Sequence, residues 1–471
     1  MCFSNYNHIC SKFLKINNMK KHVLVKALFF SMLCSAQVGV STGSVGMIKS
    51  NGLNSRNEMG ELNDRMIVVE DFMNYHKHHI SVPVYDKVQL SMDYSNSIFG
   101  NNEFLLQVGL ATQERKERKA GENNVNATIV LDRSGSMSSE NKLNTAKKAI
   151  KKFVEGLSDE DYFSLVCFDD EAQVYIPATV VGKNRTNIYS TIENITDGGS
   201  TNLNDGMMLG YNETEKHNTK GYNSRLIILT DGMTNSGETD QEKILLNSKN
   251  YNDKGIEIST VGVGNSLDFD LLKKLAENGR GSNHFVGSNE EDIQKVFVSE
   301  LQSLLFQVGK NPEVTIELPE GMEIKEFYGY NPIFIASNKV KVNIENLNAG
   351  TTQIFLMKVK SNTTNEKIKA TLKYQNNGVQ ETNILTQYSS QNPSTNSELS
   401  KNYQIAYMAT QLKVAAQEYQ KNNMGNYNTT IREILNYIDA QGNTKDTDIN
   451  RLYSIFSKLK PVASSSYSLI N

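Results

Sequence analysis

The fold is decided at Ile129-Val130-Leu131-Asp132-Arg133-Ser134-Gly135-Ser136-Met137, a stretch that begins apolar and ends polar. The apolar run 129–131 is typical of a parallel strand that is covered on both faces of its sheet. Asp132, Ser134 and Ser136 follow at every second position, and Gly135 permits a sharp bend between the serines. Apolar residues at spacings of three and four over 142–157 predict an amphipathic helix downstream. Open α/β sheets place ligands at the carboxyl ends of their strands, so this loop is a candidate binding site.

Two later segments supply further oxygen-bearing side chains. Thr201 follows a pair of glycines in the segment 197–202, and Asp231 follows a second apolar strand at 226–229. Hydroxyl and carboxylate oxygens suit Mg²⁺, Mn²⁺ or Ca²⁺, and no thiolate or imidazole in the set favours zinc. The sequence therefore offers a set of five candidate ligands for a hard cation: Asp132, Ser134, Ser136, Thr201 and Asp231.

Three motifs in this order closely resemble the metal-ion-dependent adhesion site of von Willebrand factor type A domains. They are Asp-x-Ser-x-Ser at 132–136, Gly-Gly-Ser-Thr at 198–201 and Thr-Asp-Gly at 230–232. The resemblance covers roughly residues 124–307 and implies a doubly wound, mostly parallel α/β sheet of the Rossmann-like kind. It also implies an Mg²⁺ ion, with Mn²⁺ or Ca²⁺ as alternatives, held by the five residues named above.

The same resemblance implies a function in protein binding or adhesion. In that family the ion holds an Asp or Glu carboxylate of a protein partner. Exchange of the residues equivalent to Thr201 and Asp231 in the inner coordination shell is coupled there to movement of the final helix of the domain. In this chain that helix is expected at 290–306, directly before the next domain.

An enzyme is the competing class, because a metal ion with an open coordination position can activate water. A strand that ends on Asp132 superficially resembles phosphoaspartate-forming hydrolases, but catalysis also needs a placed acid or base. His284 and Lys254 are the candidates for that role, and no motif surrounds either of them. We therefore expect a binding protein and no enzyme. A metal-dependent hydrolase, or a structural envelope or assembly protein with a vestigial metal site, is the alternative.

Composition narrows the class of protein. The 471 residues are too many for one ordinary core and indicate two to four domains. A net charge of −3 gives no basic field for nucleic acid. The chain has no Trp and a mean hydropathy of −0.46, as expected for a rather polar, soluble globular protein.

The amino-terminal residues 1–36 predict a secretory signal peptide. Lys20 and Lys21 precede a short apolar run at 23–33, and small residues lead to an exit near Ala36. A lipid anchor through Cys34 is a poorer interpretation because bulky residues precede that cysteine. No later stretch is apolar enough to span a bilayer. We therefore expect a secreted, periplasmic or cell-surface protein.

Cysteine usage agrees with export from a bacterium. Three of the four cysteines lie in the leader, so Cys167 stands alone and forms no internal disulfide. Its place in an apolar strand indicates a buried small hydrophobe rather than a nucleophile. An exported protein without disulfides fits a bacterial envelope better than an animal ectodomain.

Strands and helices are expected to alternate through 124–307. The predicted strands are 128–131, 162–168, 173–176, 226–230, 256–263 and 284–286, with 172–176 forming an antiparallel edge hairpin. The predicted helices are 142–157, 186–195, 204–216, 239–254, 268–278 and 290–306.

Alternating apolar and polar residues predict β-strands on both sides of this domain. The predicted strands are 88–92, 104–111, 314–318, 340–344, 353–359 and 370–374. Too few of them precede residue 112 to close a sheet, so we infer one β-sandwich built from both flanks, with the α/β domain inserted into it. This plan resembles that of integrin β chains and some exported bacterial proteins. A sandwich built from 308–388 alone is the alternative.

The remaining regions complete the expected layout. Three short helices, separated by Gly425 and Gly442, are predicted at the carboxyl end, as a packing element or, less favoured, a docking module. In order, we expect a signal peptide (1–36), a disordered tether (37–65), a β segment (66–123), the α/β domain (124–307), a β-sandwich region (308–388), a linker (389–400) and a helical region (401–460).

His76, His78 and His79 form a local cluster within the amino-terminal β segment. A zinc site would need a further ligand, and nothing nearby in the sequence provides one. We favour a solvated or partly packed histidine patch over a metal site.

Overall fold

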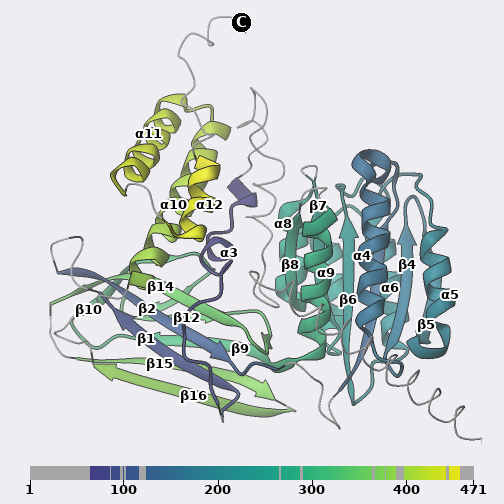
Figure 1. Ribbon diagram of the computed structural model, residues 1–471, viewed down its shortest axis with the longest axis horizontal. Helices are drawn as coiled ribbons and strands as arrows, with labels where there is room; N and C mark the ends of the chain where they lie inside the picture. The colour runs from purple at the N-terminus through teal and green to yellow at the C-terminus, as the bar shows by residue number, and fades with distance from the viewer. Residues whose placement is uncertain are drawn as a thin grey trace, which may run out of the picture. The chain divides into compact units, whose positions relative to one another are not determined.

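A computed structural model of the chain describes most of the residues after position 63 (Figure 1). The predicted signal peptide, the tether up to residue 63, linker residues 389–396 and residues 457–460 lie outside the described part. The described residues are 64–84, 86–95, 99, 102–115, 123–264, 267–286, 290–362, 366–376, 378–388, 397–441 and 445–456.

The middle of the chain forms a six-stranded sheet with helices on both faces (Figure 1). Neighbouring strands pair in parallel, except for the edge strand β5, which is antiparallel to β4. The predicted doubly wound sheet with an antiparallel edge is confirmed. In spatial order its strands are β5 (Ala172–Val180), β4 (Tyr162–Phe168), β3 (Asn124–Asp132), β6 (Tyr222–Thr230), β7 (Glu257–Val263) and β8 (Arg280–Val286).

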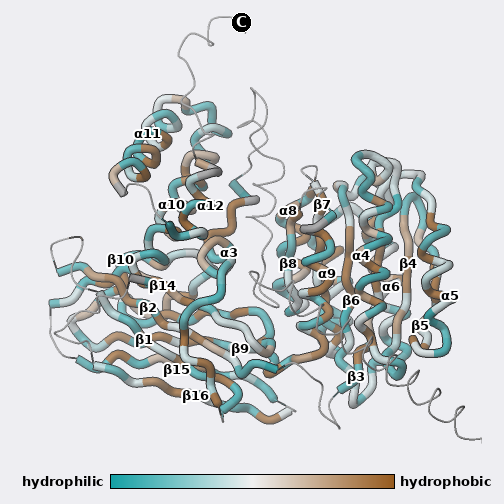
Figure 2. Tube along the Cα trace, viewed as in Figure 1, coloured by the Kyte–Doolittle hydropathy of each residue, from teal (hydrophilic) through white to brown (hydrophobic). Residues whose placement is uncertain are grey.

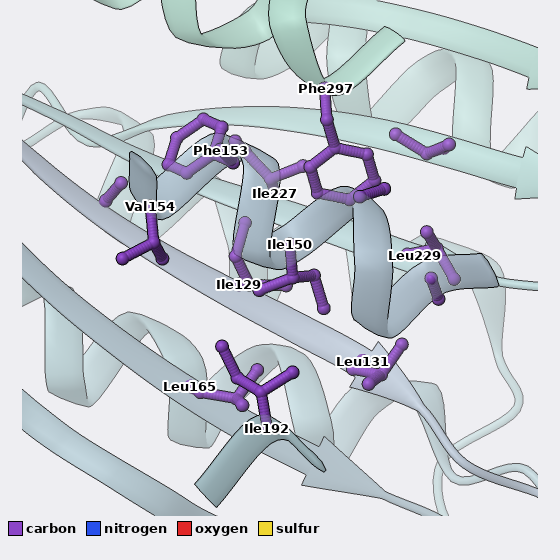
Figure 3. Packing of buried hydrophobic residues seen from close by; sticks show 14 of the residues in the cluster. Ile129, Leu131, Ile150, Phe153, Val154, Leu165, Ile192, Ile227, Leu229 and Phe297 are labelled. Carbon is purple, nitrogen blue, oxygen red and sulfur yellow. The ribbon is translucent and has the colours of Figure 1, made fainter. Parts of the chain in front are cut away.

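Strand β3 is buried on both faces because its side chains alternate between two hydrophobic clusters. Ile129 and Leu131 join the cluster under α4, α5 and α9, whereas Val130 joins the cluster under α6, α7 and α8. Figure 3 shows Ile129 and Leu131 among side chains of the first cluster, with Phe153 and Phe297 above them. The bounds of these helices are α4 (Lys142–Gly156), α5 (Val181–Glu193), α6 (Leu203–Glu215), α7 (Gln241–Asn252), α8 (Phe269–Gly279) and α9 (Glu290–Leu305).

Figure 2 shows the same arrangement as a hydropathy pattern, in which β6 is mainly brown while the helices alternate between brown and teal. A strand covered on both faces is apolar throughout, whereas a helix with one buried face alternates along its length. The polar residues that end β3 and β6 are therefore concentrated at the edge where the apolar runs stop.

Helix α9 is joined to the sheet by a buried ion network. The Arg225 guanidinium on β6 is fully buried, and its Nη1 donates to Glu300 Oε2 on α9 at 2.9 Å. Its Nε also donates to Glu257 Oε2 on β7 at 3.1 Å. His284 Nε2 lies 2.9 Å from Glu300 Oε1. One cation thus holds two acidic side chains from two different elements.

Glu257 extends this network beyond the α/β sheet. Its Oε1 accepts hydrogen bonds from Asn346 Nδ2 at 2.8 Å and from Gln307 Nε2 at 2.9 Å. Gln307 begins β9, the strand that directly follows α9. The last helix of the α/β domain and the following β region therefore share one set of buried charges.

Two further sheets enclose a separate hydrophobic cluster. One has the order β1-β2-β14-β10, and the other has the order β11-β12-β9-β15-β16, with β13 also paired to β9. Strand β2 lies before the α/β domain in sequence and pairs with β14, which follows it, in antiparallel register with Val108 opposite Phe355. The strands are β1 (Val88–Tyr94), β2 (Glu103–Thr112), β9 (Gln307–Glu317), β10 (Met322–Tyr328), β11 (Ile333–Ala336), β12 (Lys339–Asn343), β13 (Leu347–Asn348), β14 (Thr352–Ser361), β15 (Lys367–Asn376) and β16 (Val379–Tyr388).

The carboxyl-terminal part contains helices α10 (Ser397–Gln420), α11 (Met424–Gln441) and α12 (Thr447–Phe456). The predicted break at Gly425 is wrong, since Gly425 lies inside α11 and α10 extends over 24 residues. The chain turns one position after Lys421, at Asn422, whose φ of 59° is left-handed. Asparagine adopts that conformation more readily than most residues, so no glycine is needed there. The predicted linker also ends early, because α10 begins at Ser397.

These helices pack on the β region through their own hydrophobic cluster. The cluster combines residues of α10 and α11 with the short helix α3 (Val69–Met73) and with Leu105 and Ile354 from β2 and β14. A short 3₁₀ turn, Asp64–Met66, precedes α3 at the end of the predicted tether. Among the helices that the structure describes, none is both long enough and apolar enough to cross a membrane.

Candidate functional site

Three loops meet at the carboxyl ends of β3 and β6. Asp132 is the last residue of β3, and Ser134 and Ser136 follow it in the first loop. The loop before α6 carries Thr201, and the loop after β6 carries Asp231. Backbone hydrogen bonds hold the first two loops together, from the Gly135 N–H to the Gly199 carbonyl at 3.1 Å and from the Gly198 N–H to the Arg133 carbonyl at 2.8 Å. The five predicted residues therefore lie at one edge of the sheet, four of them on the loops and Asp132 at the end of β3.

Hydroxyl and carboxylate oxygens from different strands come into direct contact at this edge. Ser134 Oγ lies 3.1 Å from Ser136 Oγ, and the Ser136 hydroxyl donates to Asp231 Oδ1 at 2.7 Å. Asp132, Ser134 and Asp231 are buried, whereas Ser136 is exposed. The oxygen cluster thus reaches solvent on the side of Ser136.

Thr201 is fixed beside this cluster by its backbone. Its N–H donates to Asn235 Oδ1 at 2.9 Å, and its carbonyl accepts from the Asn235 N–H at 3.1 Å. A Cβ atom at position 232 would lie only 3.2 Å from Thr201 Oγ1, so Gly232 lets the threonine hydroxyl approach the loop that carries Asp231. These contacts place the Thr201 side chain without using its hydroxyl as a structural anchor.

Asp132 is an acid held in a nearly dry environment. Its Oδ1 accepts from the Ser134 N–H at 2.8 Å, and its Oδ2 accepts from the Thr230 hydroxyl at 2.6 Å. Burial raises its pKa from 3.8 to about 6, against these hydrogen bonds, and the charge of Asp231 adds to the rise. A cation close to the carboxylates would favour their ionised form.

Lys142, at the start of α4, completes the electrostatics of the site. Its Nζ lies 2.8 Å from Asp231 Oδ2, and its side chain is only 13 % exposed. Nothing in the sequence singles out this lysine, because it is one of several at the surface of a predicted helix. The sequence likewise indicates no role for Thr230 beyond its place in the Thr-Asp-Gly motif.

Neither candidate acid or base lies in this cluster. His284 is buried in the network of Arg225 and Glu300, and Lys254 Nζ pairs with Glu215 at the surface. Cys167 is buried in β4, as predicted, and burial raises the pKa of its thiol.

None of the five predicted ligands lines either of two cavities of about 430 and 410 Å³ among the described residues. The donor set consists of oxygens, which fits a hard divalent cation.

Comparison with known proteins identifies the domain. The model of the von Willebrand factor type A domain family matches residues 126–299. The chain is 29% identical over 258 residues to the protein YfbK of Escherichia coli (strain K12), covering 53% of this chain and 44% of YfbK. It is 28% identical over 244 residues to inter-alpha-trypsin inhibitor heavy chain H3 of Rattus norvegicus, covering 48% of this chain and 26% of that protein.

A solved structure supports the same fold. The von Willebrand factor type A protein from Catenulispora acidiphila aligns with a TM-score of 0.52 at 13% identity, covering 81% of this chain and 98% of that chain. The chain thus contains a von Willebrand factor type A domain, as its motifs predicted. The match spans less than half the length of YfbK and about a quarter of the inhibitor heavy chain.

A second group of polar side chains lies outside this domain. His76 and His78 are buried beside Glu398, at the start of α10, and one ligand atom from each lies within 4.8 Å of the others. The prediction of a solvated or partly packed patch is wrong for these two histidines, because α10 covers them. It holds for His79, whose side chain is 89% exposed. The acidic neighbour is 319 positions away from His79, so the local sequence gave no sign of it.

Proposed function

We propose that this protein binds another protein through a divalent cation, Mg²⁺ or Mn²⁺, held by the five predicted residues. The partner would present an Asp or Glu carboxylate to the cation, and the protein would act outside the cytoplasm after removal of residues 1–36. Domains of the von Willebrand factor type A class are generally protein-interaction modules, which supports this class of function over an enzyme.

The observation that carries the proposal is the convergence of oxygen donors from three loops at one edge of the sheet. Ser136 already contacts both Ser134 and Asp231, and Thr201 stands beside Gly232. Three of the five donors are neutral hydroxyls, so the charge of a cation would be only partly compensated. A divalent cation would supply a positive centre with a coordination position open to an external carboxylate.

The surroundings of each donor define what the chain itself does. Hydrogen bonds from Ser134 and Thr230 orient the Asp132 carboxylate, while the Lys142 ammonium holds one oxygen of Asp231. Lys142 therefore favours an arrangement in which Asp231 is drawn away from a cation. That arrangement leaves the cation more attractive to a carboxylate from outside.

The position of Thr201 offers a direct test of partner binding. Thr201→Ala removes one neutral oxygen and keeps the backbone hydrogen bonds to Asn235, so the fold should persist. We expect the variant to keep most of its cation affinity and to lose about ten- to a hundredfold in partner affinity, equivalent to about 1–3 kcal/mol. The measurement is retention of envelope proteins on immobilised full-length protein, in Mg²⁺ and in EDTA.

Ser138→Ala is the matched control for this experiment. Ser138 lies in the 3₁₀ turn after β3 that also contains Ser136, is exposed, and donates only to the Gly135 carbonyl among the described contacts. The control should retain the same proteins as the wild type in Mg²⁺ and release them in EDTA. Equal retention by wild type and Thr201→Ala, with and without EDTA, would show that the partner uses another surface.

Replacement of Lys142 is expected to raise an affinity rather than lower one. Lys142→Met removes an ammonium that competes for Asp231, so Mg²⁺ affinity is expected to rise about tenfold. Calorimetric titration with Mg²⁺ measures the change. Lys148→Met is the control, since Lys148 lies on the same helix but pairs with Glu290 at the exposed surface. Identical Mg²⁺ affinities for Lys142→Met and wild type would show that this ammonium does not compete with the cation.

A further inference from the structure

The segment that follows α3 is fixed in place against the β region and the carboxyl-terminal helices. The His78 N–H donates to Thr352 Oγ1 on β14 at 2.9 Å, and the His79 N–H donates to Glu398 Oε1 on α10 at 2.9 Å. The His76 and His78 rings lie edge to face, with centroids 4.5 Å apart. Two imidazoles are thus held side by side under the first turn of α10.

Hydrogen bonds around Asn74 determine which nitrogen of His78 carries a proton. Asn74 Nδ2 donates to the Glu70 carbonyl at 3.0 Å, and Asn74 Oδ1 accepts from the Ile354 N–H at 2.9 Å. The amide orientation is therefore fixed, with the oxygen of Asn74 toward His78. His78 Nε2 lies 3.2 Å from that oxygen and must donate to it. In the neutral ring this leaves Nδ1 with a lone pair.

That lone pair faces another acceptor. His78 Nδ1 lies 3.4 Å from Glu398 Oε1, the His78 side chain is fully buried, and no hydrogen-bond donor reaches Nδ1 among the described residues. Two acceptors that face each other in a buried place require a cation between them, which is either a proton or a metal ion.

The charge of the surroundings also favours a cation. Asp446 and Asp448 lie near the cluster, and Lys401 pairs with both, at 2.9 and 2.7 Å. With Glu398 there are three carboxylates and one ammonium around the two imidazoles. Asp448 Oδ2 also lies 4.0 Å from His76 Nδ1, which makes it the candidate for a fourth donor.

We propose that His76, His78 and Glu398 bind a zinc ion that fastens the segment after α3 to the first turn of α10. Two imidazoles and one carboxylate form a donor set that zinc accepts, and Asn74 would orient His78 from behind as metal-bound histidines require. Donors bound to one tetrahedral zinc ion lie about 3.3 Å apart. The present donors lie within 4.8 Å of one another, so zinc binding would draw them closer together.

The test is titration of the chelator-stripped full-length protein with Zn²⁺ alone, in buffer that contains excess Mg²⁺. We expect one zinc ion per chain and a rise in the thermal unfolding temperature. Glu398→Gln keeps the acceptor for the His79 N–H but removes the charge, and His76→Gln removes one ring nitrogen donor. Each variant should weaken zinc binding by about a hundredfold or more, and zinc should no longer raise its unfolding temperature.

His79→Gln is the matched control, because it removes the exposed ring that lies 3.2 Å from Glu398 Oε2 and keeps the backbone N–H that donates to Glu398 Oε1. It should bind zinc as the wild type does. Asp132→Ala should also bind zinc normally, which separates this site from the one on the α/β sheet. Absence of zinc binding by the wild type would overturn the proposal and assign the cation between His78 and Glu398 as a proton. Loss of zinc in His79→Gln but not in His76→Gln would overturn the assigned donors.

Discussion

Replacing Asp132 with alanine is expected to reduce Mn²⁺ affinity by about a hundredfold or more. Asp132 is the acid at the centre of the proposed cation site, and its carboxylate accepts hydrogen bonds from the Ser134 N–H and the Thr230 hydroxyl. The variant therefore loses a ligand charge and also the group that orients the serine loop. Calorimetric titration with Mn²⁺ measures the loss.

Because Asp132 is buried, this variant needs a test of folding alongside the titration. Circular dichroism and thermal unfolding in metal-free buffer provide it. Ser134→Ala is a second variant that removes one hydroxyl and no charge, and we expect it to weaken Mn²⁺ binding less than Asp132→Ala does. Ser138→Ala should bind Mn²⁺ as the wild type does. Undiminished Mn²⁺ binding by folded Asp132→Ala would contradict the assignment of the five residues as ligands of the cation.

Replacing Arg225 with methionine is expected to lower the free energy of unfolding by about 3–5 kcal/mol. The variant leaves Glu257 and Glu300 buried without the guanidinium that pairs with both. Urea denaturation of the full-length chain at pH 7 measures the effect. Lys249→Met is the control, because it breaks the exposed pair of Lys249 and Asp253 and should cost about 1 kcal/mol or less.

The pH dependence gives this prediction a second readout. Burial opposes ionisation of Glu300, but Arg225 and the hydrogen bond from His284 outweigh it and lower its pKa from 4.5 to about 2. In the wild type, the stability from this group is fully present above about pH 4.5 and is lost as the pH falls toward 2. Without Arg225, we expect burial to raise the pKa of Glu300 instead. Protonation of Glu300 at low pH then removes its unpaired buried charge and stabilises the variant.

The stabilities of wild type and Arg225→Met should therefore converge as the pH falls from 7 toward 4. Parallel stability curves over that interval would show that the loss comes from packing of the arginine stem rather than from unpaired carboxylates. Such a result would leave the network as a packing feature without an electrostatic role.

Much of the α/β domain could be predicted from local sequence. The run at 129–131 is wholly apolar and the predicted helix at 142–157 is long and strongly patterned, and the structure places β3 and α4 there. The five oxygen-bearing residues could be selected because each follows a strand or precedes a helix. Whether they hold a cation remains a prediction.

Other features depend on contacts that sequence patterns do not contain. Strand β16 has its hydrophobic residue Ile384 exposed, so it lacks the pattern of a half-buried strand and was not predicted. Lys142 pairs with Asp231, which is 89 positions away in the sequence, and Glu398 contacts His79, which is 319 positions away. The turn at Asn422 depends on one left-handed residue, and glycine was the expected choice.

The pairing of β2 with β14 also governs the order in which the chain can fold. Thr112 and Thr351, which hydrogen-bond at the end of this pair, are 239 positions apart. Loops of that length close slowly, whereas the intervening α/β domain has its own hydrophobic clusters and shorter-range contacts. During synthesis, β2 therefore cannot pair with β14 until the ribosome has made the α/β domain and β14. Until then, the apolar faces of β1 and β2 remain uncovered. Early folding of that domain would bring the two ends of the sandwich together and shorten the search.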